Sequence, residues 1–139
     1  MRRQATFSDP PHAGLPLALL GSEHVEEGSG ARLLPDVVTR GSVRIETISF
    51  RVAGQSLSQL RRHTTTAKRF GAFWKNVGID SVLLGDFAPR AEPYRFTLPR
   101  QVVPSIVMAK GEYKVRIRYT AANHADALLE MPELLLRIT

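Results

Sequence analysis

The strongest constraint on the fold is a strict alternation of apolar and charged residues near the C-terminus. From Tyr113 to Tyr119, the residues Tyr, Val, Ile and Tyr alternate with Lys, Arg and Arg. A period of two places successive side chains on opposite faces of an extended strand. We therefore predict a β-strand here, with one face buried against a second layer and the other in water.

The same alternation recurs in residues 42–52 and 94–98. Ile48, Phe50 and Val52 alternate with polar residues, and the second segment stops at Pro99, which cannot donate to a strand ladder. Val43 and Ile45 are out of phase with Ile48 and Phe50. The sequence therefore predicts either burial of both faces at one end of the first strand or a β-bulge near residues 46–47, and we favour the bulge.

The remaining segments predict an all-β protein. An apolar run at 17–20 begins the fold, and residues 22–31, rich in Glu, Gly and Ser, predict a mobile loop. Helical periodicity is weak, and only residues 121–129 offer a short turn or helix. Several short strands between turn residues favour a sandwich of two antiparallel sheets. Further strands are expected at residues 34–38, 56–63, 82–87 and 134–138.

Length and composition favour one domain in a reducing compartment. The 139 residues suffice for one core, so we expect a flexible Pro-rich lead-in over 1–16 and a single sandwich over 17–139. The absence of cysteine excludes disulfides and thiolate metal sites. No apolar run has the roughly 18 residues that a membrane helix needs, and no secretory leader pattern is present. We therefore expect a soluble, cytoplasmic protein.

The net charge of +6 raises the prospect of an anionic partner. The densest basic cluster is either a solvated loop or a functional patch, and no nucleic-acid-binding motif surrounds it, so we expect no nucleic-acid partner. Residues 69–74, which read Arg-Phe-Gly-Ala-Phe-Trp, place three aromatic side chains next to positive charge. This segment is either an exposed contact loop for a partner or an acidic membrane, or a hairpin tip folded back on the sandwich. The cluster comprises Arg61, Arg62, Lys68, Arg69 and Lys75.

No motif for catalysis is present. The chain has no GxSxG, GxxxxGK[ST] or GxGxxG sequence, and its four histidines lack the spacing of a local metal motif. Asp80, Asp86 and Glu92 are explained more simply by turn and capping roles than by paired acid and base chemistry. We predict a binding protein rather than an enzyme, with no catalytic residue, metal or cofactor.

Three blocks resemble the Rho GDP-dissociation inhibitor family. Residues 48–52 read ISFRV, residues 85–96 read GDFAPRAEPYRF, and residues 104–113 read PSIVMAKGEY. The second is similar to the family's G-[SD]-[YF]-x-P-R-x-E-x-Y-x-F block, and the third to its P-x-G-x-[LM]-A-[RK]-G-x-Y block. The order and spacing agree, and the likeness extends over about residues 16–139.

The resemblance implies an immunoglobulin-like β-sandwich that binds the geranylgeranyl tail of a Rho-family GTPase between its sheets. Such a carrier solubilises the GTPase from membranes, with transient membrane proximity, and regulates its cycling as a monomer. Phe50 is the leading pocket candidate, and contacts with the GTPase are expected at Asp86, Arg90 and Glu92. For each lining residue, an ordinary filled core is an equal alternative. The lining candidates are Ile48, Phe50, Leu60, Leu84, Phe96, Tyr113, Ile117, Leu134 and Leu136.

Three departures from the family pattern weaken this expectation. Residues 1–16 show no helical pattern like the family's regulatory arm, which puts inhibition of nucleotide exchange in doubt. The family's Asp-rich turn reads Ala121-Ala122-Asn123, and with a net charge of +6 complementarity to a polybasic partner is reduced. The tryptophan-bearing final strand of the family reads as residues 128–138, without tryptophan, and the single tryptophan is Trp74.

Two other functions remain open from the sequence. One is a broader carrier of prenylated or acylated cargo, similar to the prenyl-binding delta subunit of retinal phosphodiesterase. The other is a sandwich with a filled core that acts purely as an interaction module. Lipid-dependent binding separates the carriers from the module, and dependence on the nucleotide state separates the two carriers, because only contacts with the GTPase switch regions sense the nucleotide.

Overall fold

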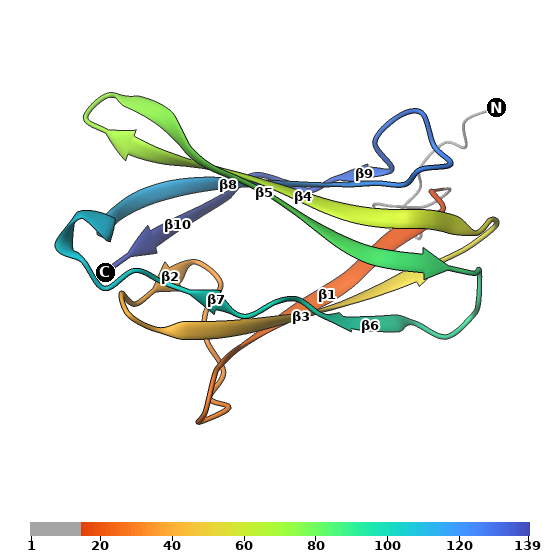
Figure 1. The fold of residues 1–139 in the computed structure, drawn as a ribbon, viewed down its shortest axis with the longest axis horizontal. Coiled ribbons are helices and arrows are strands. Elements are labelled where there is room, and N and C mark those ends of the chain that lie inside the picture. The colour runs from red at the N-terminus through yellow and green to blue at the C-terminus, as the bar shows by residue number, and fades with distance from the viewer. Residues whose placement is uncertain (1–14) are drawn as a thin grey trace, which may run out of the picture.

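The structure is a computed structural model that describes residues 15–139, and these residues form two stacked β-sheets (Figure 1). The only helical element in this range is the 3₁₀ turn η1, Val107–Ala109. The strands are β1 (Leu17–Glu26), β2 (Val37–Val38), β3 (Val43–Val52), β4 (Leu57–Phe70), β5 (Phe73–Phe87), β6 (Tyr94–Thr97), β7 (Gln101–Val102), β8 (Gly111–Thr120), β9 (Leu129–Glu130) and β10 (Leu134–Ile138).

The two sheets confirm the expected all-β sandwich. The first sheet has the order β1-β3-β6, with β7 also pairing with β3, and the second has the order β2-β10-β8-β4-β5, with β9 pairing with β8. All pairings between these strands are antiparallel except that of β2 with β10. We call the two layers the β3 sheet and the β8 sheet.

An apolar core closes one part of the space between the sheets. Phe50 is 1% exposed and stacks on Tyr94, with ring centroids 5.6 Å apart, while the edge of Phe87 meets it at 5.0 Å. Leu60 of β4 is fully buried in the same cluster. Aromatic pairs in these geometries add to the stabilisation from area burial alone. The other buried members are Leu17, Ile48, Val52, Leu57, Leu84, Leu98, Tyr119, Ala121, Leu128 and Leu129.

Strand β3 does not contain the bulge predicted near residues 46–47. Its pairing with β1 shifts register between Leu19 and Gly21, so the irregularity lies in β1. The inward phase of Ile48 and Phe50 continues unbroken through Glu46 to Arg44, which is 4% exposed. The sequence prediction was wrong because it assigned the inward phase by hydrophobicity, whereas two charged residues occupy inward positions here.

Other element boundaries also differ from the sequence prediction. The loop expected at 22–31 begins later, because residues 22–26 belong to β1 and pair with β3. The strand expected at 34–38 shortens to Val37–Val38, while those expected at 56–63 and 82–87 lengthen into one β4–β5 hairpin. Residues 1–14 of the expected lead-in lie outside the described residues.

The segment 121–129 forms a turn rather than a helix, because Asn123 ties it to the start of β4. The Asn123 Oδ1 accepts a hydrogen bond from the Ser58 N–H at 3.0 Å, and the Asn123 Nδ2 donates to the Ser56 carbonyl at 2.8 Å. Side-chain amides that bond backbone groups in this way favour turns over helix interiors.

Truncation of Phe50 should test the closed core. We expect Phe50→Ala to lower the free energy of unfolding by about 3–5 kcal/mol, the usual cost of deleting a buried aromatic ring. Phe73→Ala, at a side chain 65% exposed, is the matched control and should cost at most about 0.5 kcal/mol. Urea unfolding followed by circular dichroism measures both, and equal losses would contradict this description of the core.

Candidate functional site

The inner face of β8 and β10 carries a stripe of apolar side chains that are not fully buried. Val115 and Ile117 lie between the buried Tyr113 and Tyr119 in the same alternating phase. On β10, Leu134 pairs with Val115 and Leu136 pairs with Tyr113. The inward side chains other than the two tyrosines are only partly buried, although they face the opposite sheet. We call Val115, Ile117, Leu134, Leu136 and Ile138 the inner stripe.

Small polar residues flank the inner stripe on β4. Thr64 pairs with Ile117 and Thr66 pairs with Val115, so both lie on the inner face beside the stripe. Neither threonine is large enough to cover an adjacent apolar side chain fully, and both are themselves partly buried. The interior of the sandwich therefore contrasts with the core around Phe50, which large side chains fill.

A cluster of charged residues lies between the sheets. The Arg62 Nη2 of β4 donates to the Glu46 carboxylate of β3 at 3.2 and 3.4 Å, and the His24 Nε2 lies 3.8 Å from the same carboxylate. The Arg44 Nη2 donates to the Leu34 carbonyl at 2.7 Å. Arg62 thus pairs with the Glu46 carboxylate, and Arg44 adds a second buried guanidinium bound to a backbone carbonyl. We call Arg44, Glu46 and Arg62 the interior charge cluster.

Burial sets the electrostatics of this cluster. It lowers the pKa of His24 below 6.5, with further lowering from Arg44 and Arg62, against the opposing effect of Glu46. Burial also raises the pKa of Tyr119. The Arg62 Nε is buried without a hydrogen-bond partner, which carries a cost because an unpaired buried polar group has lost its water.

The structure places the nine predicted lining residues in different parts of the interior. Ile48, Phe50, Leu60 and Leu84 belong to the closed core, with exposures of 1%, 1%, 0% and 8%. Phe96 and Ile117 are partly buried and pack against that core. Leu134 and Leu136 are partly buried on the inner stripe, while Tyr113 is 8% exposed and donates from its hydroxyl to the Ala109 carbonyl at 2.6 Å.

Of the predicted partner-contact residues, Asp86 ties the end of β5 to β4, and Arg90 braces the loop between β5 and β6. The Asp86 Oδ1 accepts a hydrogen bond from the Gln59 N–H at 2.7 Å, where Gln59 has a φ of 51°. The Arg90 side chain lies 3.6 Å above the Tyr94 ring and donates to the carbonyls of Glu92 and Pro93 at 3.1 Å each. Glu92 itself is exposed. Arg90 therefore shapes the loop that presents Glu92.

Sequence reasoning missed the interior charge cluster. Glu46 and Arg44 stand two and four residues before Ile48, so an unbroken alternation would have placed them inward. The prediction instead followed the apolar residues Val43 and Ile45, which are out of that phase, and favoured a bulge near residues 46–47. The pairing of Glu46 with Arg62 joins two strands from different sheets, and no local pattern reports a contact between sheets.

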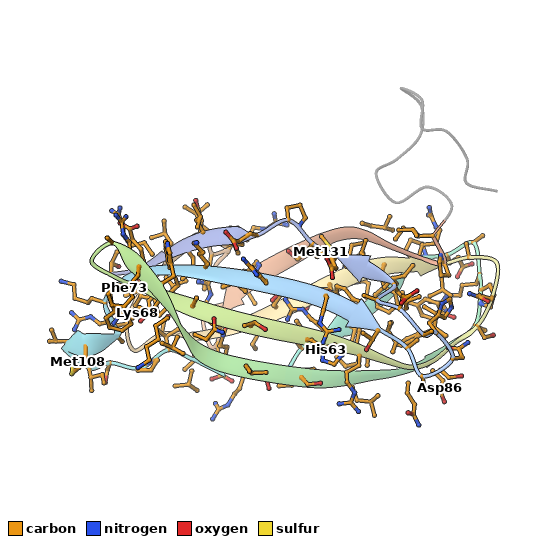
Figure 2. All side chains as sticks on the ribbon, turned by 90° about the horizontal axis from the view of Figure 1, so that it is seen from above. His63, Lys68, Phe73, Asp86, Met108 and Met131 are labelled. Atoms are coloured by element: carbon orange, nitrogen blue, oxygen red, sulfur yellow. The ribbon has the colours of Figure 1, made fainter. Side chains whose placement is uncertain are left out.

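A hollow of about 660 Å³ lies on the outer face of the β8 sheet. Its lining includes Lys114, whose ammonium lies 4.3 Å from the centre of the Trp74 ring, and Arg116, whose Nε is 2.9 Å from the Glu133 carboxylate. His63 and Met131, labelled in Figure 2, also line it. Within residues 15–139, no group of three or more His, Asp or Glu is placed to hold a metal ion, and no helix is long and apolar enough to cross a membrane.

Comparison with known proteins identifies the family. The family model described as RHO protein GDP dissociation inhibitor matches residues 35–129. This chain belongs to the Rho GDP-dissociation inhibitor family. The match runs from before β2 to the first residue of β9, so it includes the aromatic core, the loop after β5 and all of β8. This family consists of regulatory inhibitors rather than enzymes.

Individual relatives agree with the family match. Rho GDP-dissociation inhibitor 1 of Bos taurus and that of Homo sapiens are each 33% identical over 85 residues, or 58% of this chain. That alignment covers 38% of each relative. A solved alkylpurine DNA glycosylase of Pseudomonas fluorescens, bound to DNA containing an abasic site analog, covers 90% of this chain and 31% of its own, with a TM-score of 0.51 and 8% identity. At that identity the likeness concerns the fold alone.

The lowered pKa of His24 predicts a stability that depends on pH. Because the folded state binds this proton less readily than the unfolded state, stability should fall as the pH drops below 6.5. Burial lowers the pKa of His63 as well, which acts in the same direction. Urea unfolding at about pH 7.5 and about pH 5.5 should show this loss, and His24→Gln should reduce it. An unchanged difference in the variant would refute the role of His24.

Proposed function

We propose that this chain holds the isoprenoid tail of a Rho-family GTPase against the inner stripe of β8 and β10. The observation that carries the proposal is the partial exposure of large apolar side chains that face the opposite sheet. Each isoprenoid CH₂ removed from water is worth about 0.8 kcal/mol. A ligand that covers the stripe therefore gains affinity from surface that the folded protein leaves accessible.

The position of the stripe also supports this proposal. Its residues come from the centre of the β8 sheet, because β8 and β10 are neighbours between β2 and β4. Pairing with neighbouring strands holds this backbone in place. The stripe is thus rigid on one side and incompletely packed on the other, which suits a site that binds an apolar chain with little reorganisation.

The proposed contact with the GTPase protein centres on the loop after β5. Asp86, Arg90 and Glu92 are all exposed there, but Asp86 and Arg90 also contact Gln59 and Tyr94. We assign Glu92 to direct contact with the partner, and Asp86 and Arg90 to holding the loop. In this arrangement the lipid supplies most of the affinity, and the loop contributes selectivity.

Adjacent leucines on β10 provide a matched test. Leu136 lies on the inner stripe, and its neighbour Leu135, 60% exposed, lies on the outer face. We expect fluorescent geranylgeranyl-cysteine methyl ester to bind the wild-type chain saturably. Leu136→Asp should weaken binding at least about tenfold, because it puts a charge against the isoprenoid, while Leu135→Asp should leave binding unchanged.

The outcomes of this titration are distinct. Circular dichroism and urea unfolding establish that each variant is folded before binding is measured. If the folded wild-type chain binds no prenyl probe, the carrier function is excluded and an interaction module is the remaining alternative. If both leucine variants bind equally, lipid binding occurs elsewhere than the inner stripe.

The interior charge cluster favours a second candidate, a carrier of anionic amphiphiles such as fatty acids. Two guanidinium groups and a buried Arg62 Nε without a partner match a carboxylate, which arginine binds through charge-assisted hydrogen bonds. Competition separates the candidates. A fatty acid that displaces the prenyl probe in wild type, and fails to do so in Arg62→Leu, would support the second; a methyl ester that competes equally would not.

A further inference from the structure

The tip of the β4–β5 hairpin and the η1 turn form one apolar end of the molecule. Phe70 and Phe73 flank the turn of the hairpin and are 42% and 65% exposed. Beside them, Ile106, Val107 and Met108 are 63%, 72% and 80% exposed. Figure 2 shows Phe73, Lys68 and Met108 together at this end, far from Asp86 at the other. We call these five apolar residues the end patch.

Lys68 holds the two parts of the end patch together. Its ammonium donates to the Met108 carbonyl and lies 5.5 Å from the centres of both the Phe70 and Tyr113 rings. Strand pairing places Phe70 directly opposite Phe73. The hairpin tip and the η1 turn are therefore fixed next to each other, although they lie more than thirty residues apart in the chain.

The charges around the end patch are almost all positive. Residues 64–79 contain Lys68, Arg69 and Lys75 and no Asp or Glu, and residues 103–111 contain Lys110 and no acid. Glu112, the next residue, is 3.2 Å from the Arg69 guanidinium. Lys75 and Lys110 are exposed. Apolar side chains at the tip, with ammonium groups around them, form an amphipathic surface.

We propose that the end patch docks on the surface of an anionic lipid bilayer. Aromatic and long aliphatic side chains enter the boundary between headgroups and acyl chains, and lysines beside them attract acidic lipids. The net charge of +6 acts in the same direction. The apolar groups sit on two adjacent turns that project at one end, a shape suited to a soft planar surface.

This proposal stands apart from prenyl binding. The end patch consists of exposed side chains of the β4–β5 hairpin and the η1 turn, whereas the inner stripe lies between the sheets on β8 and β10. Vesicles without prenylated protein therefore test the end patch alone. A chain that binds no prenyl probe can still bind vesicles, and a chain that binds no vesicles can still bind the prenyl probe.

Vesicle flotation gives the direct test. We expect the wild-type chain to float with vesicles of phosphatidylcholine and phosphatidylserine, and to bind much less to phosphatidylcholine alone or at high salt. Phe73→Asp combined with Met108→Asp should weaken binding at least about tenfold. Lys75→Glu combined with Lys110→Glu should weaken binding only to the anionic vesicles.

Two controls keep the result specific. Ile79→Asp replaces an apolar residue that is 82% exposed on the same strand, about 20 Å along β5 from Phe73 at roughly 3.3 Å per residue, and should leave binding unchanged. Trp74, the single tryptophan, adjoins Phe73, and its emission should shift to the blue on binding. The proposal would be overturned if the wild-type chain bound no vesicles, or if Ile79→Asp weakened vesicle binding as much as the patch variants do. It would also be overturned if the patch variants kept vesicle binding and lost binding to a protein partner instead.

Discussion

The packing of Phe50 against Phe87 and Tyr94 is the interaction on which the rest of the structure depends. It joins β3, β5 and β6 across the two sheets, and Arg90 covers the outer side of the cluster. Large side chains fill this part of the interior and hold the two sheets together here. Nearer to β10 the inward apolar side chains are only partly buried.

The interior changes character beyond this cluster. Glu46 and Arg62 bridge the sheets where apolar residues would otherwise meet, and a buried ion pair of this kind adds little net stability compared with a hydrophobic pair. What the pair does bring is charge and an unpaired Arg62 Nε into the space between the sheets. An apolar stripe on β8 and β10 lies in the same interior as an excess of positive charge from Arg44 and Arg62.

The family block after β5 was recognised from the sequence as a likeness, and the structure explains why its residues occur together. Gly85 has a φ of 126°, which favours glycine, Asp86 accepts from Gln59, and Tyr94 donates from its hydroxyl to the Ala88 carbonyl at 2.7 Å. These residues fix a corner of the sandwich. Asp86, Arg90 and Glu92, the predicted partner contacts, are all exposed here, and Asp86 and Arg90 also hold the local backbone.

The sequence by itself determined the strands with strong alternation, the all-β class and the family. Period-two patterning and turn residues act between neighbours along the chain, so β8 and β10 were located to within a few residues. Only the tertiary structure decided that Phe50 and Leu136 lie in different parts of the interior, that Arg62 faces Glu46, and that η1 adjoins the β4–β5 hairpin. Each of these depends on contacts between distant segments, and local sequence patterns carry no information about which segments meet.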